Sequence, residues 1–134
     1  MNTKLALVMA VLFLAPLQAI AHHAFAAEFD RTKRVTVQGT VAKLEWSNPH
    51  IWIYVDTKEQ DGKVVRWQCE GGSPNTLTRQ GWTKVSLKQG DPVSIDGYRA
   101  KDGSNTCNSS TVKLADGRRL FAGSSAGDDA PVRQ

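Results

Sequence analysis

The stretch Trp46–Asp56 reads Trp-Ser-Asn-Pro-His-Ile-Trp-Ile-Tyr-Val-Asp, and it decides the fold of this chain. A turn is predicted at Ser47-Asn48-Pro49, after which two kinds of residue alternate strictly. One face is aliphatic: Ile51, Ile53 and Val55. The other face carries His50, Trp52 and Tyr54. This alternation predicts a half-buried β-strand, His50–Thr57. Because the second face is aromatic where a solvated face would carry lysine, glutamate or threonine, it is the best indication of function.

Further strands and one short helix are predicted on either side of this stretch. The other strands are expected at Arg34–Trp46, Val64–Glu70, Pro92–Tyr98 and Ser110–Leu114, with a last paired segment at Arg118–Ala122. Asp61-Gly62 predicts a hairpin turn before the third strand. Ser73 is a good N-cap and Pro74 suits the first helical position, so a helix is expected from Pro74 to about Gln80.

Three strands, a short helix and then two strands is the order of elements in an OB-fold, a five-stranded and partly open barrel. Gly39 interrupts the long first strand, where Val41 and Leu44 fall on opposite parities. A bulge or sharp bend at Gly39 would reset that parity. We therefore expect a mainly β, OB-like barrel with one short helix between strands three and four. A small β-sandwich is the alternative.

The amino-terminal residues are expected to direct export and to be removed. Lys4 supplies a positive charge, Leu5–Leu14 is an apolar run, and Ala19-Ile20-Ala21 matches a signal-peptidase site. The apolar run is too short to span a bilayer comfortably. Removal of 21 of the 134 residues leaves 113, enough for one small domain. We expect a signal peptide at 1–21, the domain at 22–123, a disordered tail at 124–134, and a periplasmic location.

The charge of the chain argues against a nucleic-acid binder. The formal net charge is +4, and removal of Lys4 lowers it to +3. Acidic residues are interspersed throughout, and no lysine–arginine stripe is present. Single-stranded nucleic acid requires a positive groove, which Arg66 alone does not supply.

Two cysteines, Cys69 and Cys107, are present. In an exported chain such a pair favours a disulfide over a metal or catalytic site. Closing a loop of this size stabilises a fold by roughly 4 kcal/mol on the chain-entropy argument. Two unpaired thiols are the alternative.

Several motifs together resemble an uncharacterised family of exported bacterial proteins, domain of unknown function 6152. They are His22–Asp30, Trp46–Trp52, Glu70–Asn75, Gly97–Ser104 and Leu120–Gly123. The likeness covers nearly the whole mature chain, and it implies no activity. Cys69 and Cys107 are not part of the family pattern.

A copper-type metal site is one hypothesis for function. Cleavage after Ala21 would make His22 the amino terminus, and its α-amino nitrogen and imidazole would chelate one metal ion. His23 or His50 would add a further nitrogen. Nitrogen-rich sites suit Cu(II), and also Zn or Ni. The alternative is a terminus that binds copper only because any terminal histidine does. Cleavage at the second A-x-A, Ala24-Phe25-Ala26, would remove His22 and His23.

The main hypothesis is a binding face on the outer side of strands two and three. It would present His50, Trp52 and Tyr54 beside Arg66, Gln68 and Glu70. OB-folds bind ligands on this surface, and aromatic platforms with polar neighbours suit small molecules or a protein partner. The alternative is that Trp52 and Tyr54 pack beneath the lead-in His22–Arg31 or the C-terminal segment.

Other sites receive little support. The helix start at Gly71–Asn75 offers N–H groups to an anion, but Pro74 removes one donor and Ser73 caps another, so a structural cap is favoured. No catalytic motif is recognisable. We expect a non-enzymatic binding or accessory protein with no certain cofactor.

Overall fold

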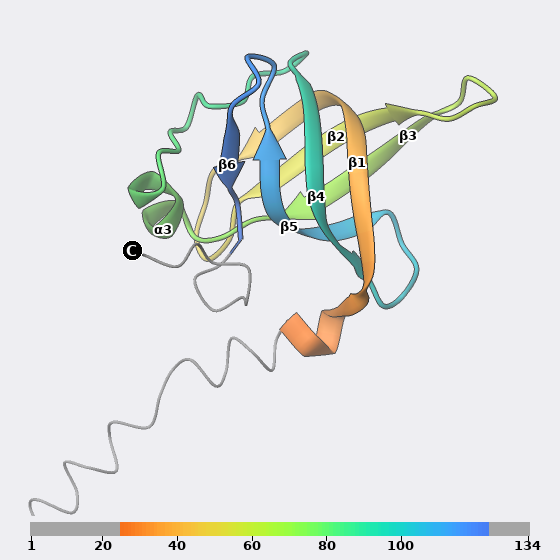
Figure 1. The fold of residues 1–134 in the computed structure, drawn as a ribbon, viewed down its shortest axis with the longest axis horizontal. Helices are drawn as coiled ribbons and strands as arrows, with labels where there is room; N and C mark the ends of the chain where they lie inside the picture. Colours follow the sequence, from red (N-terminus) through yellow and green to blue (C-terminus); the bar gives the residue numbers. More distant parts are fainter. Residues whose placement is uncertain (1–24, 124–134) are drawn as a thin grey trace, which may run out of the picture.

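The computed structural model describes residues 25–123. Within them the elements are β1 (Phe29–Glu45), β2 (Trp52–Lys58), β3 (Val64–Glu70), α3 (Pro74–Arg79), β4 (Pro92–Ala100), β5 (Thr106–Lys113) and β6 (Arg119–Phe121) (Figure 1). One helical turn at 25–28 precedes β1. The predicted signal peptide at 1–21 and the predicted tail at 124–134 lie outside the described residues.

The prediction of a mainly β fold is confirmed. The strands follow the order β3-β2-β1-β4-β5-β6, and β3 also pairs with β5. The β3–β5 pairing is parallel and short, joining Gln68–Glu70 to Thr106–Asn108, whereas the other pairings are antiparallel. In Figure 1 the hairpin between β2 and β3 extends away from the remaining strands.

Two strands begin well before the residues at which the sequence predicts their start. β1 begins at Phe29 rather than Arg34, and β5 begins at Thr106 rather than Ser110. The added residues of β5 are polar except for Cys107, so no apolar alternation marks them. They are strand because β3 and β4 both pair with them, as at Gln68↔Thr106 and Arg99↔Cys107. Tertiary pairing here overrides a weak local signal.

The predicted parity reset at Gly39 is wrong in its position. The register between β1 and β2 shifts between Val41 and Lys43, three residues further on. Leu44 can therefore pack against the core although its parity differs from that of Val41. Gly39 has a different role, because a Cβ atom there would lie 2.1 Å from the Asp56 carbonyl oxygen. A glycine allows this close approach of two backbones.

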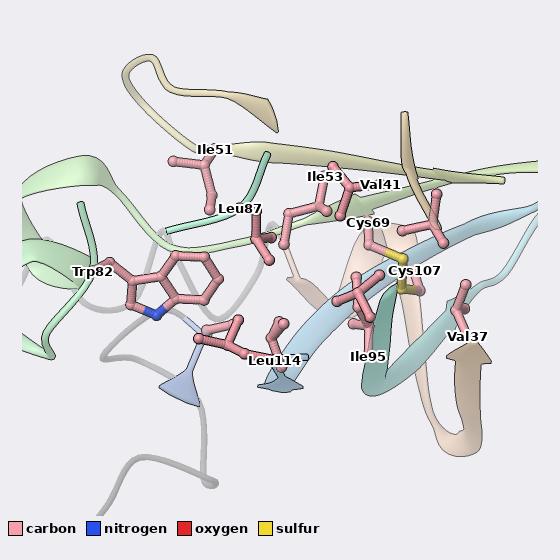
Figure 2. Packing of buried hydrophobic residues seen from close by; sticks show 14 of the residues in the cluster. Val37, Val41, Ile51, Ile53, Cys69, Trp82, Leu87, Ile95, Cys107 and Leu114 are labelled. Atoms are coloured by element: carbon pink, nitrogen blue, oxygen red, sulfur yellow. A yellow bond between two sulfur atoms is a disulfide. The ribbon is translucent and has the colours of Figure 1, made fainter. Parts of the chain in front are cut away.

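The core lies between the inward faces of the strands. The aliphatic side chains of β2, Ile53 and Val55, are fully buried, and so is Ile51 just before it. Cys69 of β3 and Cys107 of β5 are also fully buried, and they form the predicted disulfide. Figure 2 shows this bond among the core side chains. It links two strands whose pairing covers only three residues of each, so it reinforces a short seam of the sheet.

The connection from β3 to β4 is held by a capped helix and a buried tryptophan. Ser73 accepts a hydrogen bond from Thr76 N, and Pro74 occupies the first turn of α3, as predicted. Beyond the helix, Trp82 is only 1% exposed and its Nε1–H donates to Phe121 O at 2.7 Å. That bond joins the loop after α3 to β6. Figure 2 shows the Trp82 ring at one end of the core.

Ser109 is a polar residue inside this apolar core. Its side chain is fully buried, and its Oγ atom finds no hydrogen-bond partner among residues 25–123. A buried hydroxyl without a partner costs about 1–3 kcal/mol. We expect Ser109→Ala to raise the free energy of unfolding by about 1 kcal/mol, measured by urea denaturation. Ser110→Ala is the matched control, because Ser110 does have an interaction partner. A loss of stability in Ser109→Ala would contradict the prediction.

Candidate aromatic binding face

The outward face of β1, β2 and β3 is arranged in rows across the sheet. Trp52 lies between Glu45 of β1 and Glu70 of β3. Tyr54 lies between Lys43 and Gln68, and Asp56 lies between Thr40 and Arg66. Trp52 and Tyr54 are half-buried, while the alternate residues Ile53 and Val55 are fully buried. The alternation in the sequence therefore predicted correctly which side of β2 faces outward.

His50 is fixed beside this face by the chain after β3. Its Nδ1–H donates to Gly71 O at 2.9 Å, because a carbonyl oxygen only accepts. Gly71 is itself held in place, since Gly71 N donates to Ile51 O and a Cβ there would lie 2.6 Å from Ile51 Cγ1. The imidazole is 37% exposed. With Nδ1–H engaged in this way, Nε2 is the ring atom that carries the lone pair whenever the imidazole is neutral.

Glu70 lies next to His50 and is the least exposed carboxylate of this face. Its side chain is 12% exposed, and Oε1 is 3.3 Å from His50 Nδ1. Burial raises the pKa of the Glu70 carboxyl above its ordinary value, while the charge of His50 opposes that rise. The Glu28 carboxylate, from the turn before β1, raises the same pKa further. The lead-in segment therefore approaches the His50–Glu70 pair.

A cavity of about 520 Å³ opens beside Trp52. Its walls come from the turn before β1, from β2 and β3, and from the loop between β4 and β5. The lining residues are Ala27, Glu28, Phe29, Trp52, Gln68, Ala100, Lys101, Asp102, Ser104 and Thr106. A cavity of this size is within the range of small-molecule sites. The Trp52 side chain is thus next to the lead-in, which the sequence offered as one alternative, but it lines a cavity there.

Arg66 is separated from Trp52 along the sheet. It pairs with Asp56, two rows beyond the Trp52–Glu70 row, or on the order of 13 Å along the strand. Arg66 donates to both carboxylate oxygens of Asp56, from Nε at 2.8 Å and Nη2 at 2.9 Å. These hydrogen bonds lower the pKa of Asp56. Arg66 therefore lies on the predicted face but is already engaged by a neighbouring strand.

Tyr54 lies in the row between the Trp52 row and the Asp56 row. Its hydroxyl donates to Glu45 Oε2 at 3.3 Å, and Lys43 Nζ lies 5.5 Å from the centre of its ring. Lys43 Nζ is also 3.2 Å from Glu45 Oε2. These contacts orient the tyrosine ring between two charged residues of β1, and they join the middle row to the Trp52 row.

The two other predicted metal ligands, His22 and His23, lie outside the described residues. Within residues 25–123 no group of three or more histidine, cysteine, aspartate or glutamate side chains is placed to hold a metal ion. His50 and Glu70 form a pair only. A metal site at His50 would therefore depend on ligands from the segment before residue 25.

The start of α3 is a structural cap, as the sequence favoured. Gly72 N donates to Ala122 O at 2.8 Å and Gly71 N donates to Ile51 O at 2.9 Å. Ser73 Oγ accepts a hydrogen bond from Thr76 N, and Pro74 has no N–H group. These donors are used within the fold and not offered to an anion.

Sequence reasoning missed the far wall of the Trp52 cavity. Glu28, Lys101, Asp102, Ser104 and Thr106 all line it, but they are distant from Trp52 in the sequence. The likeness to an exported family included Gly97–Ser104 and His22–Asp30, yet nothing in those segments indicates that they meet. Only the pairing of β1 with β4, at Phe29↔Ala100, brings them together.

Within residues 25–123 we find no helix with the length and apolar character needed to cross a membrane. No curated protein and no solved structure matches the chain. Residues 10–109 match a family profile, in agreement with the motifs of the sequence. Because this match spans most of the 134 residues, the chain belongs to the family described as "Family of unknown function (DUF6152)".

Proposed function

We propose that this protein is an exported, non-enzymatic binding or accessory protein of the bacterial periplasm. It binds a small ligand or a protein partner on the outer face of β2 and β3, with Trp52 and His50 at the centre and Tyr54 and Arg66 towards the edge. Export rests on the apolar run and cleavage site at 1–21. Intact mass of the exported protein tests it: a mature chain should begin at His22.

The proposal includes an OB-like barrel. Support comes from the β3–β5 pairing, which brings together two strands that have three others between them in the order β3-β2-β1-β4-β5. The position of α3 between β3 and β4 also agrees with that architecture. In such a fold the outer surface of strands two and three is a ligand-binding surface.

The observation that carries the proposed function is the cavity beside Trp52. A large aromatic side chain that lines an open cavity keeps part of its apolar surface uncovered by the protein. That surface can contact a ligand. His50 lies before the same strand, with Nδ1 anchored on Gly71 O. The pair supplies an aromatic surface and an oriented polar ring, which are the ordinary constituents of a small binding site.

The test is loss of binding in Trp52→Ala. The immobilised protein is incubated with a periplasmic extract, and the molecule that it retains is quantified by mass spectrometry. We expect the variant to retain about tenfold less or lower still, because buried tryptophans dominate binding energies. Val85→Ala is a matched control, since Val85 is an apolar residue, 67% exposed, in the loop after α3. Equal retention by Trp52→Ala and the unmodified protein would remove the support for this face.

Copper-type metal binding through His22, His23 and His50 is the second candidate. It is favoured by the bond from His50 Nδ1–H to Gly71 O. Metal-bound histidines usually donate their second ring N–H to a carbonyl or carboxylate in this way. The Glu28 carboxylate, six residues after His22 in the sequence, also raises the pKa of Glu70, the neighbour of this ring.

Titration of the correctly processed protein with Cu(II) tests the second candidate. We expect His50→Ala to weaken Cu(II) binding by about tenfold, because one of few nitrogen ligands is lost. Binding by the N-terminal histidine alone would be unchanged in this variant. Circular dichroism of His50→Ala provides the folding control, since loss of the Gly71 contact removes one hydrogen bond.

A further inference from the structure

We propose that the cavity beside Trp52 binds a small organic amine in its ammonium form. This inference rests on the proposed function, because it names the chemical class of the ligand that the aromatic face would take. The argument uses the shape of the cavity, its hydrogen bonds and its charges.

Several neutral hydrogen-bonding groups on one side of the cavity are bonded to one another. Gln68 Nε2 donates to Thr106 Oγ1 at 3.1 Å, and Ser104 Oγ donates to the same oxygen at 2.9 Å. These neutral groups do not by themselves select a class of ligand, so the charged groups of the cavity decide it.

The carboxylates of the cavity, unlike its neutral groups, carry charge that a ligand can pair with. The Glu28 carboxylate lines it, and within residues 25–123 no hydrogen bond or ion pair to that carboxylate is found. Lys101, the cation of the cavity wall, donates from Nζ to Ala26 O. Asp102 accepts Ser104 N at 2.9 Å, which leaves part of its acceptor capacity for another donor. The lining residues thus offer more carboxylate than ammonium.

The row across the sheet places two further carboxyl side chains beside the tryptophan. Trp52 is paired directly with Glu45 on one side and with Glu70 on the other. Glu45 is 3.2 Å from Lys43 Nζ and Glu70 lies against His50, so both are already engaged. The net negative charge of the cavity wall comes from Glu28 and Asp102, two carboxylates against the one ammonium of Lys101. A ligand that responds to the local field is therefore positively charged.

An ammonium group would interact both with the carboxylates of the cavity and with the tryptophan ring. A cation is attracted to the face of a tryptophan ring, more strongly than to tyrosine or phenylalanine, and the attraction grows as water is excluded. The Glu28 carboxylate provides the charge-assisted hydrogen bond that an N–H donor requires. The alkyl part of the ligand would lie against Phe29 and Ala100 in the cavity wall.

Isothermal titration calorimetry of the mature protein with putrescine tests the inference, with butanediol of the same chain length as the neutral control. We expect putrescine to bind and butanediol to give no heat of binding. Because the interaction is electrostatic at a partly open site, the putrescine affinity should fall as salt is raised. Equal behaviour of the two probes, or absence of putrescine binding, would overturn the inference.

Two variants test the contributions of the Glu28 charge and the Trp52 ring separately. Glu28→Gln keeps the size of the side chain and removes its charge, and it should weaken putrescine binding by about tenfold, equivalent to about 1.4 kcal/mol. Trp52→Leu should weaken it to a similar degree. Glu59→Gln, in the hairpin turn between β2 and β3, is the control and should leave the affinity unchanged. Affinity that is indifferent to Glu28→Gln and Trp52→Leu would place the amine elsewhere and would also overturn the inference.

Failure of this inference and failure of the proposed function give different results. If putrescine does not bind while Trp52→Ala still reduces retention from periplasmic extract, the binding face stands and only its ligand class is wrong. If Trp52→Ala leaves retention unchanged as well, both are wrong.

Discussion

Replacing Cys69 and Cys107 together with alanine should lower the free energy of unfolding by about 4 kcal/mol. The bond closes a loop with a sequence separation of 38 residues, and its loss returns that loop's entropy to the unfolded chain. Both residues are fully buried, so alanine introduces no unsatisfied polar group. A domain of this size has only about 5–15 kcal/mol of stability, so the loss would be severe. Urea denaturation measures it.

Reduction of the unmodified protein supplies the control for this prediction. A reductant should bring its unfolding midpoint close to that of the double alanine variant, and the variant itself should not respond to the reductant. The short β3–β5 pairing should lose hydrogen-exchange protection first, because three residues of each strand are all that joins this seam. A double variant as stable as the unmodified protein would contradict the assigned role of the disulfide.

Replacing Trp82 with alanine should cost about 3–5 kcal/mol of unfolding free energy. The ring is 1% exposed and belongs to the main core cluster. Its loss leaves a cavity at the end of the core and also removes the Nε1–H donor to Phe121 O. Because that contact holds the loop after α3 against β6, the near-ultraviolet circular dichroism of the variant should weaken as well.

Two controls separate the parts of the Trp82 effect. Trp82→Phe keeps much of the apolar contact and loses the hydrogen bond, so it should cost clearly less than alanine, about 1–2 kcal/mol. Lys84→Ala, at an exposed position in the same loop, should change stability by no more than about 0.5 kcal/mol. An alanine variant at position 82 as stable as Lys84→Ala would show that the ring contributes little.

Local signals in the sequence predicted much of the fold. β3 was placed at Val64–Glu70 as the structure has it, because β-branched and aromatic residues alternate there between clear turn signals. The capped start of α3 followed from Ser73 and Pro74, whose effects are confined to one helical turn. Both are short-range properties. The start of β5 was missed because its residues are strand only through their partners in β3 and β4.

The candidate site was predicted in part. The outward direction of Trp52 and Tyr54 followed from strand alternation, and the placement of Gln68 and Glu70 beside them followed from the predicted hairpin. The contact of His50 Nδ1 with Gly71 O joins residues 21 positions apart, and no local pattern specifies it. The same is true of the cavity, whose walls come from four segments that are far apart in the sequence.

The sequence by itself determined which face of β2 enters the core, where the hairpin turns, how α3 begins and which two cysteines pair. Each of these depends on side-chain period, turn chemistry or the small number of available partners. Only the tertiary structure decided that Glu28 and Asp102 share a cavity with Trp52, and that Trp82 closes the core against Phe121. The physical reason is that these contacts join segments far apart in the chain, and their geometry is set by how the whole sheet twists and pairs.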